Sequence, residues 1–347
     1  PGGLSPAQRH TRRLWAAFAM SGIALASGVL VAASRTLPYF SFSPGNAIET
    51  EALVEVEEGQ PTFQSEGEIL FLTARIGRVT PLEAFAGWVA GDVDIFEEAG
   101  VLGGLRDEEN RLRQAEAMTA SKNTALIVAL DELGLPYDPT GTGAVVQEPP
   151  TAGSPADGLV QVADTIVSID GQPIGLSSEL GEAIGSRPPG TEVTIGVEDL
   201  DGEVREVVAT LAARPDDPNR GFLGVATETR DFEPRAAFAV DINQGQVGGP
   251  SAGLAFTLAI IDVLTEGDLT GGLRIAVTGS IGPDGTVFAV GGVAQKTVAA
   301  AAAGADVLLL PAGEEAEAMR SPRGLEIIGV EDIDDALAVL ADLGGDP

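Results

Sequence analysis

The sequence predicts an α+β protein with two folded parts behind an apolar N-terminal segment. Residues 141–213 alternate short strand-like runs with one amphipathic helix, and residues 237–340 alternate buried strand patterns with helices. Before them, residues 14–33 form a run of twenty residues without a charge. These three observations indicate two domains of different texture and one candidate membrane segment.

The composition excludes several classes of function. The chain has 347 residues and a formal net charge of −32, which argues against nucleic acid as a partner because binding it needs clustered Lys and Arg. There is no cysteine, and the single histidine, His10, lies in the N-terminal tail. Disulfides, thiolate catalysis, a Ser-His-Asp triad and a histidine metal cluster are therefore excluded, and we expect no metal and no other cofactor.

The N-terminal segment is expected to anchor the chain in the cell membrane. Residues 1–13 are polar and basic, and the run over 14–33 is long enough to cross a bilayer as a helix. The positive residues place residues 1–13 in the cytoplasm as a tail, and the rest of the chain outside it. A cleaved signal peptide is the alternative, with Val31-Ala32-Ala33 as an acceptable site, but the apolar run is longer than a usual secretory core. Residues 34–46 are interpreted as a membrane-proximal linker.

Residues 47–134 combine two strand patterns with two helices. The strand-like runs are 47–56 and 68–76. Thr80-Pro81 has the signature of a helix start, and a longer helix is expected from about 108 to 133, where Gly134 and Pro136 end it.

Residues 135–213 resemble a PDZ domain of the bacterial type. The pieces that carry the resemblance are Ser154-Pro155-Ala156, the strand and turn Asp164 to Gly171, Pro189-Gly190-Thr191, a helix over 178–186 and a hairpin of 192–197 with 203–210. The resemblance implies that an extended peptide or a C-terminus binds by strand addition beside the helix. Gly221 to Gly224 and Gly141 to Gly143 remain alternative carboxylate-binding loops, and a role of the domain as a spacer also stays open.

Two short motifs in the C-terminal region carry the candidate chemistry. Gly248-Gly249-Pro250-Ser251-Ala252-Gly253 places a serine in a tight turn before an apolar run that reads as a buried helix. Ser251 then lies at a helix N-terminus, where free N–H groups point at whatever it attacks. Gly291-Gly292 precedes Lys296, and only Lys122 and Lys296 are lysines. Because desolvation lowers the pKa of a lysine among apolar neighbours, Lys296 is the candidate general base.

Other interpretations of the serine motif are excluded, because the residues that they require are missing from the sequence. Gly249-x-Ser251-x-Gly253 matches a nucleophile elbow, but the elbow needs a downstream histidine. Neither a P-loop nor a G-x-G-x-x-G motif is present. A serine–lysine dyad remains, in which neutral Lys296 takes the proton of Ser251, and the backbone around Gly249, Pro250 and Ala252 stabilises the oxyanion.

Residues 237–340 resemble the proteolytic domain of the Lon-type serine–lysine peptidases. The resemblance rests on Gly249-Pro250-Ser251-Ala252-Gly253, on Gly291-Gly292 with Lys296, and on Thr270-Gly271 and Thr278-Gly279. It implies that Ser251 is the nucleophile, that Lys296 is the general base, and that Thr278 holds the lysine amine. One departure is Gly248, since an aspartate usually stands three residues before the serine in that family.

The whole chain resembles the membrane-anchored, PDZ-containing Lon-like proteases of bacteria. This resemblance implies a Lon-type domain with an inserted PDZ-like domain: residues 47–134 as the N-terminal part of the protease domain, 135–213 as the PDZ-like domain and 214–347 as the catalytic part. It also implies a homo-oligomer, because Lon-type domains resemble ring-formers that are often hexamers.

The predicted function is ATP-independent endoproteolysis outside the membrane. No Walker sequence or AAA+ module is found in the 347 residues, so we expect cleavage of unfolded or PDZ-delivered protein chains. The alternative is a non-catalytic, membrane-anchored PDZ adaptor that keeps the Lon-like fold as a scaffold. It stays open because the neutrality of Lys296 depends on the folded structure.

Overall fold

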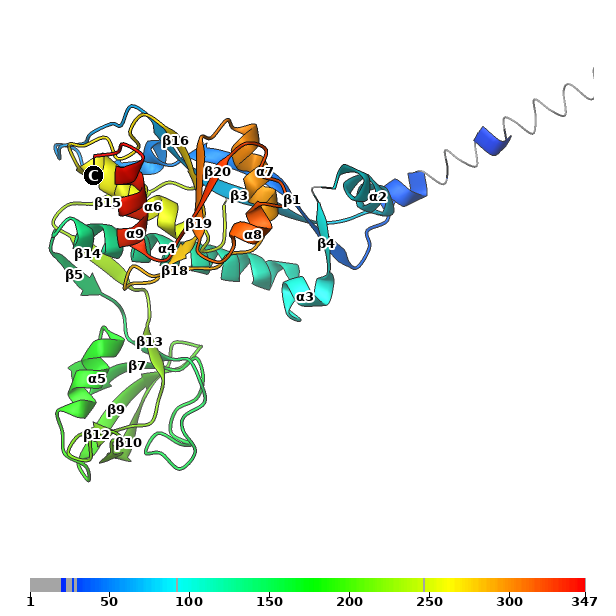
Figure 1. Ribbon diagram of the computed structural model, residues 1–347. Helices are drawn as coiled ribbons and strands as arrows, with labels where there is room; N and C mark the ends of the chain where they lie inside the picture. Colours follow the sequence, from blue (N-terminus) through cyan, green and yellow to red (C-terminus); the bar gives the residue numbers. More distant parts are fainter. Residues whose placement is uncertain (1–19, 23–26, 28–29, 92, 246, 347) are drawn as a thin grey trace, which may run out of the picture. The chain divides into compact units, whose positions relative to one another are not determined.

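The computed structural model describes residues 20–22, 27, 30–91, 93–245 and 247–346, which form two compact units (Figure 1). The first unit comprises the described residues of Pro1–Glu55, Pro61–Ala125 and Ile242–Pro347. The second unit comprises Val56–Gln60 and Leu126–Asp241. The second unit is therefore inserted in the sequence of the first.

A six-stranded mixed sheet organises the first unit. Its strand order is β20-β19-β16-β3-β1-β4, in which the first four strands run parallel and β1 pairs antiparallel with both β3 and β4. The interior strand β19 is buried at every position, as expected for a parallel strand covered on both faces. The strands are β1 (Tyr39–Glu49), β3 (Glu68–Arg78), β4 (Asp94–Glu97), β16 (Arg274–Val277), β19 (Val307–Pro311) and β20 (Glu326–Val330).

Helices cover both faces of this sheet. Phe71 and Leu72 are neighbours on β3, so their side chains point to opposite faces. Phe71 packs edge-on against Phe256 of α6 (Gly253–Leu264), with ring centroids 5.5 Å apart. Leu72 instead joins the cluster that contains Val293 and Ala300 of α7 (Val293–Ala302). The helix that follows Ser251 and the helix that carries Lys296 thus pack against opposite faces of one strand.

The remaining helices and short strands of the first unit complete this frame. The helices are α2 (Pro81–Ala90), α3 (Glu98–Leu102), α8 (Glu315–Ala318), α9 (Ile333–Asp342) and the 3₁₀ helix η1 (Glu51–Leu53). The short strands are β17 (Ser280–Ile281) and β18 (Val287–Phe288). Three elements contain a boundary between the units: α4 (Asp107–Glu132), β2 (Val54–Val56) and β15 (Val240–Ile242).

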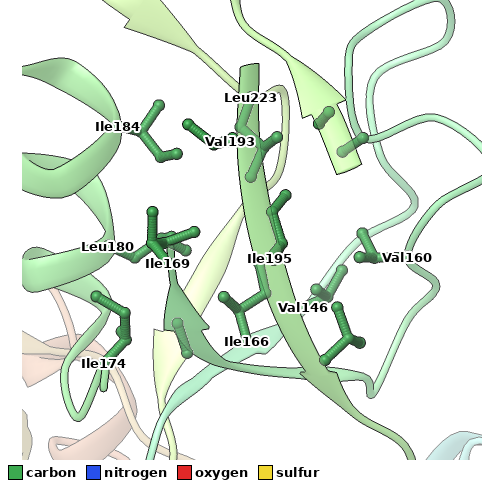
Figure 2. Packing of buried hydrophobic residues seen from close by; sticks show 14 of the residues in the cluster. Val146, Val160, Ile166, Ile169, Ile174, Leu180, Ile184, Val193, Ile195 and Leu223 are labelled. Carbon is green, nitrogen blue, oxygen red and sulfur yellow. The ribbon is translucent and has the colours of Figure 1, made fainter. Parts of the chain in front are cut away.

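The second unit is a small sheet covered by one helix. The sheet order is β10-β9-β7-β6-β13, with β8 added to β7. Leu180 and Ile184 lie one turn apart on α5 and point toward Ile169, Val193 and Ile195 of the sheet (Figure 2). The elements are β5 (Tyr137–Thr140), β6 (Ala144–Val146), β7 (Thr165–Ile169), β8 (Gln172–Pro173), α5 (Ser177–Gly185), β9 (Glu192–Glu198), β10 (Val204–Thr210), β11 (Ala212–Ala213), β12 (Gly221–Phe222), β13 (Thr227–Thr229) and β14 (Glu233–Ala236).

One sequence interpretation is wrong at the start of the first unit. Residues 39–46 were expected to lie in a linker, but they form most of β1, which pairs with β3 and β4. Pro44 and Gly45 disguise this strand, because the pairing register shifts between Pro44 and Ala47 and proline is tolerated at such a bulge. The expected helices near 108–133 and 178–186 and the hairpin of 192–197 with 203–210 are present within one or two residues.

Most of the expected membrane helix, residues 14–33, lies outside the described residues. Residues 30–34 are helical. Within the part of the chain that the structure describes, no helix has both the length and the apolar character needed to cross a bilayer.

A buried carboxyl group makes the stability of the first unit depend on pH. Glu51 accepts a hydrogen bond from the N–H of Ile69 at 2.6 Å, while its second oxygen is buried without a partner among the described residues. Burial raises the pKa of Glu51 from 4.5 to about 7, and the nearby Asp262 adds to the rise. The folded state therefore holds a proton on Glu51 that the unfolded state releases near pH 4.5.

We predict that the free energy of unfolding falls as pH rises from about 4.5 to 7, because in this range the folded state keeps a proton on Glu51 that the unfolded state has already lost. Above this range Glu51 causes no further loss of stability. Glu51→Gln mimics the neutral carboxyl group and keeps an acceptor for Ile69, so it should gain stability relative to wild type between pH 5 and 8. Urea unfolding at both pH values measures the difference, with the exposed Glu58→Gln as the control. An equal pH dependence in wild type and Glu51→Gln contradicts the assignment.

Candidate active site

The loop that carries Ser251 is fixed on one side by the end of β16. The carbonyl oxygen of Ser251 accepts the N–H of Gly279 at 3.0 Å and the hydroxyl of Thr278 at 3.3 Å. The N–H of Leu254 returns a bond to the carbonyl of Gly279 at 3.1 Å. Ser251 is half-buried and lies two residues before the first residue of α6. Its backbone position is therefore set by a strand from the centre of the sheet.

On its other side the loop is held by α4. The hydroxyl of Ser121 donates to the carbonyl of Pro250 at 3.0 Å, and the N–H of Gly249 donates to the carbonyl of Gln114 at 2.9 Å. Gly249 has a φ of +91°, and a Cβ there would lie 2.9 Å from the side-chain oxygen of Gln114. Glycine is favoured here by this positive φ, since the Gln114 oxygen is the movable end of a flexible side chain. Ser121 and Gln114 were not among the predicted site residues, and their sequence context gave no signal for them.

The predicted oxyanion region supplies two free donors. Gly249 has given its N–H to Gln114, and Pro250 has no N–H to give. The N–H groups of Ser251 and Ala252 make no hydrogen bond within the described residues. Of the three predicted positions, the structure thus leaves Ala252 as a donor, and it adds the N–H of Ser251 itself.

Lys296 is buried on α7 with a hydroxyl as its partner. Its side chain is 3 % exposed, and its Nζ donates to the Oγ1 of Thr278 at 3.0 Å. Burial lowers the pKa of Lys296 from 10.5 to about 8, and the charges of Glu314 and Glu317 oppose this fall. A substantial fraction of the amine is therefore neutral near pH 8, as a general base requires.

Glu314 and Glu317 also hold the beginning of α7. The carboxylate of Glu314 accepts the N–H of Val290 at 3.1 Å, and that of Glu317 accepts the N–H of Ala294 at 3.4 Å. Carboxylates near a helix N-terminus satisfy its free N–H groups and its dipole. The two glutamates thus position the helix of Lys296 while favouring the protonated form of the amine.

Thr278 links the two members of the predicted dyad. It accepts from Lys296 and donates to the carbonyl of Ser251, so the structure brings all three residues together. Within the described residues, the Ser251 hydroxyl makes no hydrogen bond of its own to the Lys296 amine. Such contacts are often long in enzymes without substrate and tighten when substrate is bound.

A cleft of about 1240 Å³ opens beside both motifs. Its lining includes Gly248 from the serine loop and Gly292 and Gln295 from the lysine motif. Phe40, Phe42 and Phe96 are among its apolar residues. The cleft therefore has the volume for an extended peptide and reaches the residues flanking the candidate dyad.

Gln295, next to Lys296 in the sequence, is a polar residue that sequence reasoning missed. It is 2 % exposed and its amide nitrogen donates to Asp94 of β4 at 2.9 Å. Its side-chain oxygen is buried and has no partner among the described residues. This hydrogen bond connects α7, which carries Lys296, to β4, an edge strand of the sheet whose Asp94 also lines the cleft.

Comparison with known proteins assigns both parts of the chain. Residues 227–342 match the family model of the Lon protease (S16) C-terminal proteolytic domain, and residues 118–211 match that of the PDZ domain. The chain carries a Lon-type proteolytic domain and a PDZ domain. Most of the Lon-type match lies in the first unit, and most of the PDZ match lies in the second unit.

Similar proteins match mainly over the Lon-type domain. Lon proteases of Phenylobacterium zucineum and Clostridioides difficile are 45% and 39% identical to the chain over 93 and 104 residues. These alignments cover 26% and 28% of this chain but 12% and 13% of the relatives, so the chain spans about an eighth of their length. The crystal structure of the PDZ domain of an SdrC-like protein from Listeria innocua matches at 26% identity with a TM-score of 0.22, over 24% of this chain and 92% of that one.

The second unit has a groove of about 460 Å³ beside α5. Leu180 and Ile184 of α5 line it, together with Arg214 and the stretch 221–225. The N–H groups of Leu223 and Gly224 have no partner among the described residues, and β13, which follows, is an edge strand of the sheet. Free N–H groups before an exposed edge are the features of a carboxylate-binding loop.

The rival loop has fewer free donors, because among the described residues only the N–H of Gly141 is without a partner. The N–H groups of Thr142 and Gly143 donate to the carbonyls of Arg230 and Gly175. The geometry therefore favours Gly221 to Gly224 over Gly141 to Gly143 as the carboxylate-binding loop.

As for metals, the described residues contain no group of three His, Asp or Glu side chains suited to an ion.

The lowered pKa of Lys296 predicts that kcat/KM for a peptide rises with pH up to about 8 and is level above it, because the neutral amine is the base. Glu317→Gln removes a charge that raises this pKa, so the rise should move to lower pH. The pH profile between 6 and 10 measures both effects, with the exposed Glu326→Gln as the matched control. A profile that still climbs at pH 10, or an equal shift in Glu326→Gln, contradicts this role of Lys296.

Proposed function

We propose that the protein is a serine endopeptidase that hydrolyses peptide bonds with the dyad Ser251 and Lys296. The observation that carries the proposal is the burial of the Lys296 amine against the Thr278 hydroxyl, which itself contacts the backbone of Ser251. The Lon-type match over residues 227–342 supports a peptidase of the same kind.

The proposed reaction proceeds in two steps. Neutral Lys296 accepts the proton of the Ser251 hydroxyl as its oxygen attacks the peptide carbonyl, and the N–H groups of Ser251 and Ala252 stabilise the oxyanion. The protonated amine then gives its proton to the leaving nitrogen, which leaves an acyl group on Ser251. Lys296, again neutral, activates a water molecule that hydrolyses this ester and regenerates the hydroxyl. Thr278 keeps the amine in place throughout.

We further propose that cleavage needs no ATP and acts on unfolded or flexible chains. The sequence contains no nucleotide-binding motif, and the cleft beside the dyad accommodates an extended backbone. Such a peptidase acts on segments that are already unfolded, or on chains that the PDZ domain delivers by their C-termini.

The setting of the enzyme is also a proposal. The uncharged run over residues 14–33 with its basic flank supports a single membrane anchor with the Lon-type domain outside the cytoplasm. Assembly as a homo-oligomeric ring, expected from the family resemblance, belongs to the same proposal.

Substitution of the dyad tests the peptidase directly. The full chain in detergent, without ATP, should cleave an unfolded protein, and Ser251→Ala should lower kcat by roughly 10⁴-fold or more because no other nucleophile replaces the hydroxyl. Lys296→Arg keeps the positive charge but cannot act as a base, so it should be equally inactive. Lys122→Arg, at the only other lysine, is the matched control and should stay active. Mass spectrometry of the products measures the cut sites.

Two outcomes of this experiment contradict the proposal. Equal residual cleavage in wild type and in both dyad variants would identify a contaminating protease. No cleavage by wild type, with or without a peptide that fills the PDZ groove, would favour the non-catalytic adaptor.

Peptide binding tests the PDZ groove separately. A peptide with a free C-terminal carboxylate should bind at least about tenfold more tightly than its amidated form, since the free N–H groups at Leu223 and Gly224 need an anionic partner. Arg214→Ala should weaken binding of the free acid, and Arg235→Ala, an exposed arginine of the same compact unit outside the groove, should not. Calorimetry measures both, and equal affinity for acid and amide excludes the carboxylate-binding loop.

A further inference from the structure

Two large apolar side chains of helix α2 are exposed. Leu82 and Val89 are 41 % and 66 % exposed, and their spacing of seven residues places them on one stripe of the helix. Gly87 is buried on the opposite side, where a Cβ would lie 2.9 Å from Val93. Among its described side chains, α2 therefore turns an apolar stripe outward, whereas an ordinary surface helix turns its apolar stripe toward the core.

This orientation belongs to a well-formed helix. The hydroxyl of Thr80 accepts the N–H of Glu83, and the carboxylate of Glu83 accepts the N–H of Thr80, which together make a capping box with Pro81 in the first turn. Gly91 ends the helix in the left-handed conformation. Both ends are thus stabilised locally, and the exposed stripe is a fixed surface.

The stripe lies close to the end of the uncharged N-terminal run. Leu37 donates its N–H to the carbonyl of Val79 at 2.8 Å, and Val79 donates to the carbonyl of Tyr39 at 3.1 Å. Thr80, the next residue, caps α2. Four residues of chain reach at most about 14 Å, so Ala33, the last residue of the run, lies within that distance of Leu37.

We infer that α2 is a membrane-surface helix, which inserts its stripe of Leu82 and Val89 into the interface of the bilayer beside the anchor. The inference rests on the proposed anchor, because residues 14–33 bring the bilayer within reach of α2. A short helix with an exposed apolar stripe buries that stripe where acyl chains meet the headgroups. The anchor and α2 then attach the Lon-type domain to the membrane at two points.

The composition of α2 indicates which lipid chemistry it meets. Pro81–Ala90 contains one charged residue, Glu83, and no Lys or Arg. Its attachment therefore depends on apolar burial, and neither anionic lipid nor low salt should be needed. The structure gives no sign that substrate is the occupant, since none of the α2 residues with described side chains is among those that line the cleft.

Lipid-carried quenchers test the inference on the full chain. The sequence has no cysteine, so Leu82→Cys and Val89→Cys each give one site for an environment-sensitive fluorophore. Leu112→Cys, on α4 and 61 % exposed, is the matched control. The labelled chains are reconstituted in phosphatidylcholine vesicles with or without a brominated lipid, and alkaline carbonate extraction reports anchoring independently.

The expected result is blue-shifted emission at positions 82 and 89 that brominated lipid quenches at least twofold, with unchanged emission at 112 and no effect of added salt. Water-like emission at 82 and 89 in chains that resist extraction overturns the inference alone. A blue shift at 82 and 89 that grows with the protein-to-lipid ratio and is not quenched by brominated lipid also overturns the inference. That result would identify a second copy of the chain as what covers the stripe. Release of the chain from the vesicles by carbonate contradicts the proposed anchor and therefore also overturns the inference. The peptidase assay in detergent tests the catalytic proposal separately.

Discussion

The hydrogen bond between the Lys296 amine and the Thr278 hydroxyl is the contact on which the site depends. A buried ammonium is costly unless a charged partner compensates it, and the partner here is a neutral hydroxyl. The fold therefore favours the neutral amine through burial. That burial in turn requires α7 to lie close against the sheet, which its small residues Ala299 and Ala300 allow in the cluster with Leu72.

The position of Ser251 depends on segments of the first unit from both sides of the inserted stretch Leu126–Asp241. Ser121, which holds Pro250, precedes this stretch in sequence, whereas Gly279, which holds Ser251 itself, follows it. Neither contact exists until the two parts of the first unit have associated. The proposed nucleophile is thus ordered by tertiary structure on both sides, although its motif is local in sequence.

The sequence predicts those features that depend on neighbouring residues and misses those that depend on distant ones. The helix after Ser251, the helix of Lys296 and the PDZ hairpin follow from local patterns, and the link from Lys296 to Thr278 follows from a family resemblance. The hydrogen bonds from Gln114 and Ser121 to the serine loop were not predicted, because the sequence of a helix does not indicate which distant segment packs against it. The strand β1 escapes because Pro44 and Gly45 at its bulge are typical of a linker.

The glycine at position 248 changes the charges around the dyad. The family resemblance implies an aspartate there, and a Cβ on Gly248 would lie 3.1 Å from the Cβ of Gln114, so α4 would have to shift by a few tenths of an ångström to admit a side chain. The serine loop therefore brings no carboxylate to the site from this position. The negative charges that act on Lys296 come instead from Glu314 and Glu317, across the first turn of α7. Because Glu317 also lines the cleft, a bound substrate excludes water near it and strengthens its effect on the amine. Substrate binding would then stabilise the protonated lysine that forms when Ser251 attacks, at the step where this charge appears.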